Sequence, residues 1–248
     1  MTLKEFFEQH RSVALAFSGG VDSAYLLYAA VTAGCDVGAY YVHAEFQPAF
    51  ERADAHALAA RLGVDLREIK LSVLSDEAVV RNDENRCYYC KKRIFTAIAQ
   101  AAKRDGYVLL LDGTNASDDA DDRPGMRALA ELSVRSPLRE CGLTKAEIRR
   151  LSREADLPTW DKPAYACLAT RIETGTAITR ADLERTEQAE NAMMSMGFTD
   201  FRVRTVGGAA KIQVTEAQLP RLIERRQEIL STLKPLYGGV TLDMEVRG

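Results

Sequence analysis

The sequence predicts an α/β protein with a doubly wound parallel sheet, followed by a smaller α+β domain at its C-terminal end. Over the first two-thirds of the 248 residues, short apolar runs alternate with stretches of helical composition. Such an order is typical of a parallel sheet that carries helices on both faces. After about Ile172 the order changes to helix, two strands, helix and strand. Residues 157–167, which are punctuated by prolines, are expected to form the loop between the two parts.

The first part should contain strands that are short, apolar and separated by helices. The expected strands are residues 13–17, 37–43, 65–71 and 108–111, and the expected helices are residues 22–33, 48–62 and 87–103. A capping box formed by Thr144 and Glu147 predicts the start of a further helix. Ile148, Leu151 and Ala155 follow at helical spacing and therefore share one face of it.

The second part should be a small α+β domain rather than a continuation of the sheet. We expect helices at residues 179–196 and 220–233, and strands at residues 201–206, 210–214 and 241–246. The expected division is therefore a domain of residues 1–171 and a domain of residues 172–248, the smaller one serving substrate binding or oligomer contacts.

Charge and cysteine content restrict the partners and the compartment. Acidic residues outnumber Lys and Arg by 36 to 33, which gives a net charge of −3 and argues against a protein held to nucleic acid by bulk charge. A local basic patch remains compatible with this balance. The N-terminal residues lack the pattern of a secretion signal, and no apolar run reaches the length of a membrane span. Five cysteines, an odd number, then favour free thiols in the reducing cytoplasm.

The most informative motif is Ser18-Gly-Gly-Val-Asp-Ser23, which directly follows the first apolar run. Gly19 and Gly20 allow the backbone to approach a bound group, and the start of the next helix attracts an anion. Ser18 and Ser23 add hydroxyl donors, while Asp22 can cap the helix or meet a metal ion bound to phosphate. An ordinary tight turn is the alternative. The G-x-x-x-x-G-K-[ST] pattern is absent, which excludes the phosphate loop of kinases and GTPases.

Three cysteines form a second candidate site. Cys87 and Cys90 form a C-x-x-C motif, and Cys167 follows in the loop between the domains. A C-x-x-C motif alone is compatible with half a zinc site, a redox pair or core packing. Three thiolates are also sufficient to bind three irons of a [4Fe–4S] cluster and to leave the fourth iron open. Cys35 and Cys141 are interpreted as structural.

Charged residues of the second domain form a third candidate site. Arg202 and Arg204 alternate along an expected strand and should share a face about 7 Å apart, with Lys211 on the next strand. Such a cluster suits phosphate or carboxylate, and a solvated sheet face is the alternative. Glu190 lies on the apolar stripe of residues 179–196, where an acid needs a partner. We expect it to pair with Arg202 or Arg204 or to act as an acid or base, and a salt bridge at the edge of the helix is the alternative.

The glycine motif resembles the pyrophosphate loop, or PP-loop, of the N-type ATP pyrophosphatases. Their fold, of the adenine-nucleotide-hydrolase kind, is therefore implied for the first domain. These enzymes cleave ATP between its α and β phosphates, adenylate an oxygen of the substrate, and let a nucleophile displace AMP. In this chain the resemblance implies ATP as a cosubstrate. Asp118, Asp119 and Asp122 could then help to hold Mg²⁺, although a solvated acidic turn is the alternative reading.

Further blocks resemble one family within this superfamily, the LarE sulfur-insertion enzymes of nickel-pincer nucleotide biosynthesis. The blocks are Asp112-Gly-Thr-Asn115, Asp122-Arg-Pro-Gly125, Val134-Arg-Ser-Pro-Leu138, Thr159-Trp-Asp-Lys-Pro163 and Cys167-Leu-Ala-Thr-Arg171. In this family ATP adenylates a carboxylate of a pyridinium dicarboxylate mononucleotide, and sulfur then displaces AMP to give a thiocarboxylate. The product serves the cofactor of lactate racemase.

The resemblance also implies roles for individual residues. Some members donate the sulfur of the cysteine at the Cys167 position and leave dehydroalanine, whereas others also carry a C-x-x-C motif and hold a [4Fe–4S] cluster. This chain resembles the second kind. The implied roles are catalysis for Cys167 and Asp22; ATP binding for Ser18, Gly19, Gly20, Asp22, Ser23 and Asn115; substrate binding for Arg202 and Arg204; and cluster binding for Cys87, Cys90 and Cys167. The residue pattern described above adds Glu190 to the catalytic candidates and Lys211 to the substrate-binding candidates.

The expected partners are a small nucleotide substrate and a sulfur donor, either sulfide or a desulfurase, in a homo-oligomeric cytoplasmic enzyme. A tRNA thiolation enzyme of the same superfamily is one alternative, and the net charge of −3 counts against it. A LarE enzyme that sacrifices Cys167 without a cluster is another. A regulatory module that only binds ATP is a third, against which the presence of both the loop and the Cys167 block argues.

Overall fold

The computed structural model describes residues 1–118 and 124–247. It divides into two compact units, Met1–Val73 with Glu84–Lys162 and Leu74–Asp83 with Pro163–Gly248. The boundary expected at residues 171 and 172 falls inside the second unit, because the short 3₁₀ helix there packs against the helix and strand that follow it.

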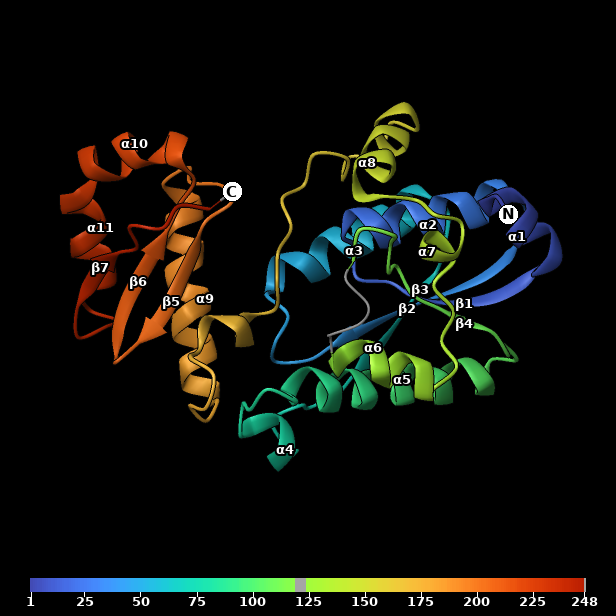
Figure 1. Ribbon diagram of the computed structural model, residues 1–248, viewed down its shortest axis with the longest axis horizontal. Coiled ribbons are helices and arrows are strands. Elements are labelled where there is room, and N and C mark those ends of the chain that lie inside the picture. Colours follow the sequence, from blue (N-terminus) through green and yellow to red (C-terminus); the bar gives the residue numbers. More distant parts are fainter. Residues whose placement is uncertain (119–123, 248) are drawn as a thin grey trace. The chain divides into compact units, whose positions relative to one another are not determined.

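The first unit is built on a parallel sheet with the strand order β3-β2-β1-β4 among the described residues. The strands are β1 (Ser12–Ala16), β2 (Asp36–His43), β3 (Leu66–Lys70) and β4 (Leu110–Leu111). Figure 1 shows α2 (Val21–Thr32) and α3 (Ala49–Arg61) on one face, and α5 (Arg86–Arg104) and α6 (Pro124–Glu131) on the other. This arrangement confirms the predicted α/β class with helices on both faces of a parallel sheet.

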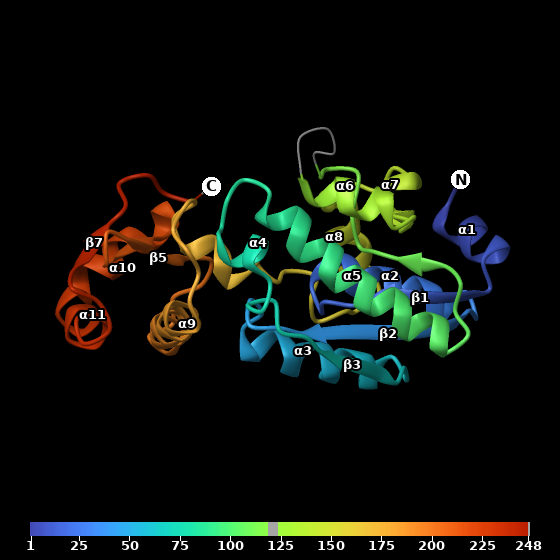
Figure 2. The same cartoon turned by 90° about the horizontal axis from the view of Figure 1, so that it is seen from below.

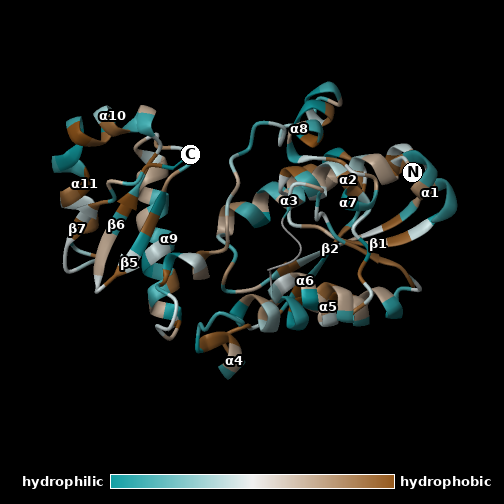
Figure 3. Ribbon diagram, in the orientation of Figure 1, coloured by the Kyte–Doolittle hydropathy of each residue, from teal (hydrophilic) through white to brown (hydrophobic). Residues whose placement is uncertain are grey.

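The central strand β1 is buried by helices on both faces of the sheet. Val13 and Leu15 of β1 are no more than 1% exposed and contact Phe6, Leu26 and Leu27 in one apolar core. Figure 2 shows the same unit from below, with α5 lying along the sheet. Figure 3 shows brown, apolar residues along β1, whereas α8 (Lys145–Glu154) is largely hydrophilic. Burial on both faces therefore explains why the central strand β1 is an apolar run from Val13 onward, whereas the edge strand β3, which contains Arg67, Glu68 and Lys70, is only partly buried.

Strand β4 is shorter than the expected residues 108–111. Its pairing with β1 begins at Leu110, which lies opposite Ala14. Val108 is 99% exposed and precedes the point at which the chain reaches the sheet. The apolar run therefore overestimated this strand. The Leu109 carbonyl still accepts a hydrogen bond from the Ala14 N–H (2.8 Å), but only Leu110 and Leu111 form strand pairs with β1.

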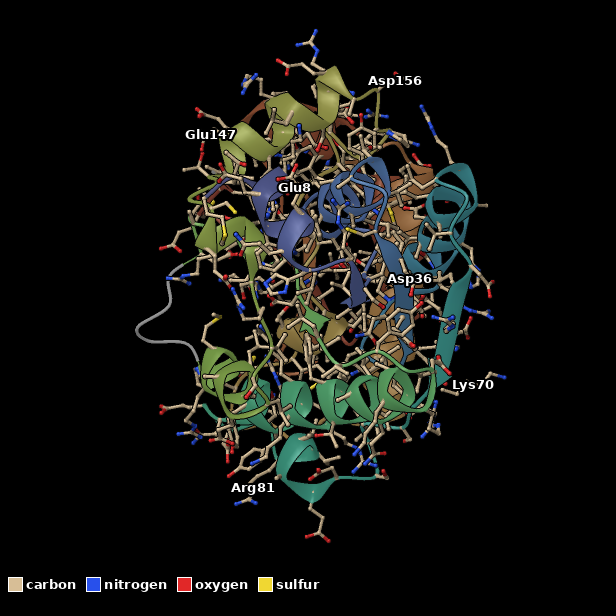
Figure 4. The ribbon with its side chains drawn as sticks, turned by 90° about the vertical axis from the view of Figure 1, so that its right-hand side faces the viewer. Glu8, Asp36, Lys70, Arg81, Glu147 and Asp156 are labelled. Carbon is tan, nitrogen blue, oxygen red and sulfur yellow. The ribbon has the colours of Figure 1, made fainter. Side chains whose placement is uncertain are left out.

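Short helices complete the first unit, and the predicted capping box is confirmed. They are α1 (Leu3–Gln9), α7 (Pro137–Glu140) and α8 (Lys145–Glu154). At the start of α8, the Glu147 N–H donates to Thr144 Oγ1 (3.3 Å), and the Thr144 N–H donates to Glu147 Oε2 (2.9 Å). Figure 4 shows Glu147 and Lys70 pointing outward from the ribbon. Cys35 and Cys141 pack against the core of this unit, and burial raises the pKa of both thiols.

The second unit combines helices with a small mixed sheet of order β5-β6-β7 among the described residues. Its elements are α4 (Glu77–Val80), η1 (Leu168–Arg171), α9 (Arg180–Ser195), β5 (Arg202–Val206), β6 (Ala209–Gln213), η2 (Glu216–Gln218), α10 (Leu219–Glu224), α11 (Arg226–Leu233) and β7 (Val240–Leu242). Strands β5 and β6 are antiparallel, and β6 and β7 are parallel. The segment with α4 joins this unit through backbone hydrogen bonds to Asn82 and Val80 from the N–H groups of Gly175 and Ile178.

Two expected elements of this unit differ in the structure. The helix expected over residues 220–233 is divided at Arg225 into α10 and α11. The Arg225 side chain donates to the carbonyl of Met196, at the end of α9, and forms an ion pair with Glu228 of α11. The junction between α10 and α11 is therefore attached to the end of α9. The strand expected over residues 241–246 ends at Leu242. None of the helices in the described part of the chain has the length and apolar composition that crossing a membrane requires.

Gly38 in β2 generates a prediction about stability. A Cβ at this position would lie 2.4 Å from Arg67 Nη1 and 2.6 Å from Tyr107 Cε2, because the Arg67 guanidinium stacks on the rings of Tyr40 and Tyr107. We therefore expect Gly38→Ala to lower the free energy of unfolding by about 1–3 kcal/mol, measured by urea denaturation. Gly239→Ala is the control, since its Cβ would meet its nearest atom only at 3.6 Å. Equal stability of the two variants would show that this stack does not constrain β2.

Candidate functional site

The glycine motif forms a loop between β1 and α2, as the sequence predicts. Gly20 is the N-cap residue of α2 and provides no side-chain cap for the helix. Gly19 has a φ of +73°, and a Cβ there would lie 3.0 Å from Cα of Ala55 in α3. Glycine is therefore required at position 19 both by its backbone conformation and by the close approach of a helix. The result is a helix N-terminus whose first-turn N–H groups are left for an anion.

The two serines of the motif close the loop on itself. Their hydroxyl oxygens, Ser18 Oγ and Ser23 Oγ, lie 3.1 Å apart. The Ser18 N–H donates to Ser23 Oγ (3.3 Å), and the Ser23 hydroxyl donates to the carbonyl of Gly20 (3.2 Å). These contacts hold both hydroxyls beside the glycine backbone, where each can serve a bound oxyanion.

Asp22 connects the loop to two distant segments. One carboxylate oxygen accepts a hydrogen bond from Asn115 Nδ2 (3.3 Å), and the other lies 2.5 Å from Lys145 Nζ. Asn115, which is 2% exposed, was expected at the nucleotide site. Lys145 was not, because 123 residues separate it from Asp22 and it looked like an ordinary first residue of a capped helix. The structure thus brings a cation into the site that sequence reasoning missed.

The block Asp112-Gly-Thr-Asn115 lies directly against the same helix end. A Cβ on Gly113 would lie 3.0 Å from the backbone nitrogen of Ser23, so a glycine permits this approach. Asp112, which is 5% exposed, accepts hydrogen bonds from Thr114 and from Ser136 Oγ (2.6 Å). These contacts fix the loop after β4 beside the loop after β1.

Lys162 is a second cation beside the glycine loop. Its Nζ lies 2.7 Å from Asp54 Oδ2 and 3.5 Å from the carbonyl oxygen of Gly19. The residue belongs to the Thr159-Trp-Asp-Lys-Pro163 block, whose role the sequence did not define. Through Lys162, this block therefore contacts the backbone of the glycine loop.

A cavity of about 280 Å³ opens at the carboxyl ends of β1, β2 and β4. Ser18, Asp22 and Ser23 line it together with Tyr41 and Lys91. Strands β2 and β4 lie on opposite sides of β1, so the strand order reverses its direction at β1. Ligands of open α/β sheets bind at the carboxyl ends of the strands where the order reverses. Burial raises the pKa of the Tyr41 hydroxyl.

The aspartates expected near Mg²⁺ are only partly described. Asp118 lines the same cavity, and its Oδ2 accepts a hydrogen bond from the backbone N–H of Asn115 (3.0 Å). It is therefore next to the residue that contacts Asp22. Asp119 and Asp122 lie outside the described residues.

None of the five cysteines is part of a disulfide bond among the described residues. Cys87 and Cys90 stand three residues apart near the start of α5, on one face of the helix, and Arg86 Nη2 lies 3.6 Å from Cys87 Sγ. Both belong to the first unit, whereas Cys167, the N-cap residue of η1, belongs to the second. Within residues 1–118 and 124–247, no three His, Cys, Asp or Glu side chains gather as a metal site.

In the second unit, Arg202 and Arg204 of β5 share a face, as predicted. Arg202 donates to the carbonyl of Ala164, and Arg204 Nη1 donates to the carbonyl of Thr170 (2.8 Å). Lys211 lies opposite Arg204 on β6, and its Nζ is 3.0 Å from Asp243 Oδ2. Burial and the charge of nearby arginines lower the pKa of Arg202 to about 10 and shift the pKa of Arg204 in the same direction. The cluster is thus a site of concentrated positive charge.

Glu190 pairs with Arg171 rather than with the arginines of β5. Arg171 Nε and Nη2 lie 2.8 and 3.3 Å from its carboxylate oxygens, and the side chains of Arg171 and Glu190 are 0% and 1% exposed. The Tyr165 hydroxyl and the N–H of Val203 (3.0 Å) donate to the same carboxylate. The pairing follows from packing, since η1, which carries Arg171, lies against α9.

The parallel sheet and its glycine loop define the first unit as a Rossmann-like α/β unit of the PP-loop class. No family model matches the chain. Over 98% of its length it is 34% identical to an uncharacterized protein of Synechocystis, across 92% of that protein. Over 98% it is 31% identical to the pyridinium-3,5-bisthiocarboxylic acid mononucleotide synthase of Lactiplantibacillus plantarum, across 89% of the synthase. An uncharacterized protein of Methanocaldococcus jannaschii is 28% identical across 93% of its length. The chain therefore belongs to the LarE family.

The buried pair generates a prediction of coupling. Arg171→Met or Glu190→Gln alone leaves a buried charge without its partner, which we expect to lower the free energy of unfolding by about 3–5 kcal/mol. The double variant should lose less than the sum of the two, by about 1 kcal/mol or more. Urea denaturation measures all three. Arg150→Met is the control, because its ion pair with Glu154 is about 60% exposed, and it should change stability by about 0.5 kcal/mol or less. Additive losses would refute the coupling.

Proposed function

We propose that the chain is an ATP-dependent enzyme that makes thiocarboxylates of a pyridinium dicarboxylate mononucleotide, for nickel-pincer cofactor synthesis. The observation that carries this proposal is the similarity to the Lactiplantibacillus plantarum synthase along 98% of the chain. The site in the first unit supports it, because a glycine loop at a helix N-terminus suits the phosphates of a nucleotide.

The proposed reaction has two steps in which all atoms are accounted for. A carboxylate oxygen of the acceptor attacks the α phosphorus of ATP, and the bond from that phosphorus to the bridging oxygen of the β phosphate breaks. Pyrophosphate leaves, and the acceptor becomes an acyl adenylate. Hydrosulfide then attacks the acyl carbon, and the bond to the AMP oxygen breaks. The products are a thiocarboxylate, AMP and a proton.

The residues of the glycine loop have distinct roles in the first step. The N–H groups that follow Gly20 and the hydroxyls of Ser18 and Ser23 bind the β and γ phosphates, where the helix dipole favours negative charge. Asp22, which contacts Asn115, would hold the Mg²⁺ that accompanies ATP, since this ion prefers oxygen ligands. Lys145 stabilises the negative charge that develops on pyrophosphate. Gly19 keeps the loop close to α3.

The basic cluster of the second unit supports an anionic acceptor. Within the described residues of that cluster, the cations exceed the acids by two: Arg171, Arg202, Arg204, Lys211 and Arg247 against Glu190, Asp200 and Asp243. Excess positive charge that is partly buried favours a ligand with phosphate or carboxylate groups. We assign Arg204 and Lys211 to direct acceptor binding. Arg202, which is 5% exposed, adds its positive charge to the same cluster.

We further propose that Cys87, Cys90 and Cys167 bind a [4Fe–4S] cluster. The donor set fits in kind, because none of the three cysteines is in a disulfide and two of them share one helix face. A cluster held by three thiolates would supply one iron with an open coordination position for the sulfur donor. The alternative is that Cys167 itself gives up its sulfur and becomes dehydroalanine.

Substitution of Asp22 and of Lys145 tests the adenylation step. We expect Asp22→Ala and Lys145→Met each to slow pyrophosphate release from ATP, in the presence of the dicarboxylate mononucleotide, by about 100-fold or more. Circular dichroism should show an unchanged fold, since both side chains are partly exposed. Lys103→Met, at the exposed end of α5, is the matched control and should behave as wild type. Wild-type release by either site variant would remove that residue from the mechanism.

Analysis of iron and acid-labile sulfide tests the cluster. Anaerobically purified protein should contain both, and Cys87→Ala should lose both together with activity, because two thiolates hold a cubane poorly. Cys35→Ala, which changes a thiol packed against the core, should retain them. Wild type supplied with sulfide should turn over repeatedly and keep Cys167 unmodified in intact-mass spectra. Dehydroalanine at position 167 after one turnover, in protein without iron, would establish the sacrificial mechanism instead.

A further inference from the structure

The segment that carries Cys167 is held by arginine side chains. Residues 162–167 have no regular secondary structure, so their backbone groups need other hydrogen-bond partners. Three carbonyl groups of residues 163–171 each accept a hydrogen bond from a different arginine: Ala164 from Arg202, Ala166 from Arg171 (3.0 Å) and Thr170 from Arg204 (2.8 Å). The arginines of the basic cluster therefore also serve as supports for this segment.

These contacts fix the backbone on both sides of Cys167. The carbonyl held by Arg171 belongs to Ala166, the residue directly before it. The carbonyl of Cys167 itself accepts from the Thr170 N–H (3.0 Å) and the Thr170 hydroxyl (2.8 Å). Arg171 Nη1 also donates to that hydroxyl (2.7 Å). One guanidinium thus orders the residues before and after the cysteine.

Glu190 holds that guanidinium in place. Its carboxylate receives Arg171, the Tyr165 hydroxyl and the Val203 N–H, and Tyr165 lies two residues before Cys167. The carboxylate is 1% exposed, and donors already occupy both of its oxygens. A proton acceptor in the reaction would need an accessible lone pair. The surroundings of Glu190 instead suit a fixed counter-ion.

We propose that Glu190 and Arg171 are positioning residues that fix the backbone of Cys167, and so the direction in which its sulfur is presented. Glu190 acts through Arg171 and Tyr165 and transfers no proton. This inference rests on the proposed function only where it names sulfur transfer as the step affected. The ordering of residues 165–172 by Glu190 is a property of the folded chain and can be measured without any substrate.

Hydrogen–deuterium exchange of the full-length protein tests the ordering directly. Glu190→Gln should accelerate exchange in a peptide covering residues 165–172 by about tenfold or more, because hydrogen bonds to a charged group are lost. Tyr165→Phe removes only one contact with the carboxylate, keeps the buried pair, and should accelerate exchange by a smaller factor. It carries the test if Glu190→Gln does not fold. Glu184→Gln, an exposed position on the same helix, is the control and should leave the peptide unchanged.

The kinetic readout separates positioning from proton transfer. With ATP and the dicarboxylate mononucleotide, Glu190→Gln should slow thiocarboxylate formation at least about tenfold more than it slows pyrophosphate release. Unchanged exchange in both variants would overturn the proposal, as would loss of activity in Glu190→Gln with wild-type exchange, which indicates acid or base catalysis. If wild type itself releases no pyrophosphate, the proposed function fails, and the exchange rates still decide whether Glu190 orders the cysteine segment.

Discussion

Strand β1 is the element on which the arrangement of the first unit depends. It pairs with β2 on one edge and β4 on the other, and its residues are buried by helices on both faces. The glycine loop therefore begins at the carboxyl end of a central strand, at the same edge of the sheet where the loops after β2 and β4 begin. Gly19 and Gly113 then allow α3 and the β4 loop to approach within van der Waals distance of the loop. Close backbone approach, rather than any one side chain, creates this site.

The second unit is organised by a buried charge. Glu190 is a carboxylate within an otherwise apolar helix face, and a charge in that position is tolerated only when donors surround it. Arg171, Tyr165 and the backbone of β5 supply those donors. Arg171 and Tyr165 belong to the segment around Cys167. The hydrogen bonds that these two residues donate to the buried carboxylate therefore also determine the path of that segment. The same arginines belong to the cluster with excess positive charge on which the proposed acceptor site rests.

The two units therefore hold their polar groups by different means. In the first, helix dipoles and backbone N–H groups favour an anion, and Lys145 and Lys162 add point charges beside the loop. In the second, guanidinium groups hold carbonyl oxygens and a carboxylate at fixed places.

The sequence by itself determined the α/β class, the parallel sheet, the glycine loop at a helix start, the capping box of α8 and the family. Each depends on local periodicity or on residues adjacent in the chain. It overestimated β4, and it joined α10 to α11, because pairing distance and the contact of Arg225 with Met196 are not local properties. Only the tertiary structure paired Glu190 with Arg171 and Asp22 with Lys145. A charged side chain has several possible partners in a sequence, and packing of distant elements decides which of them it meets.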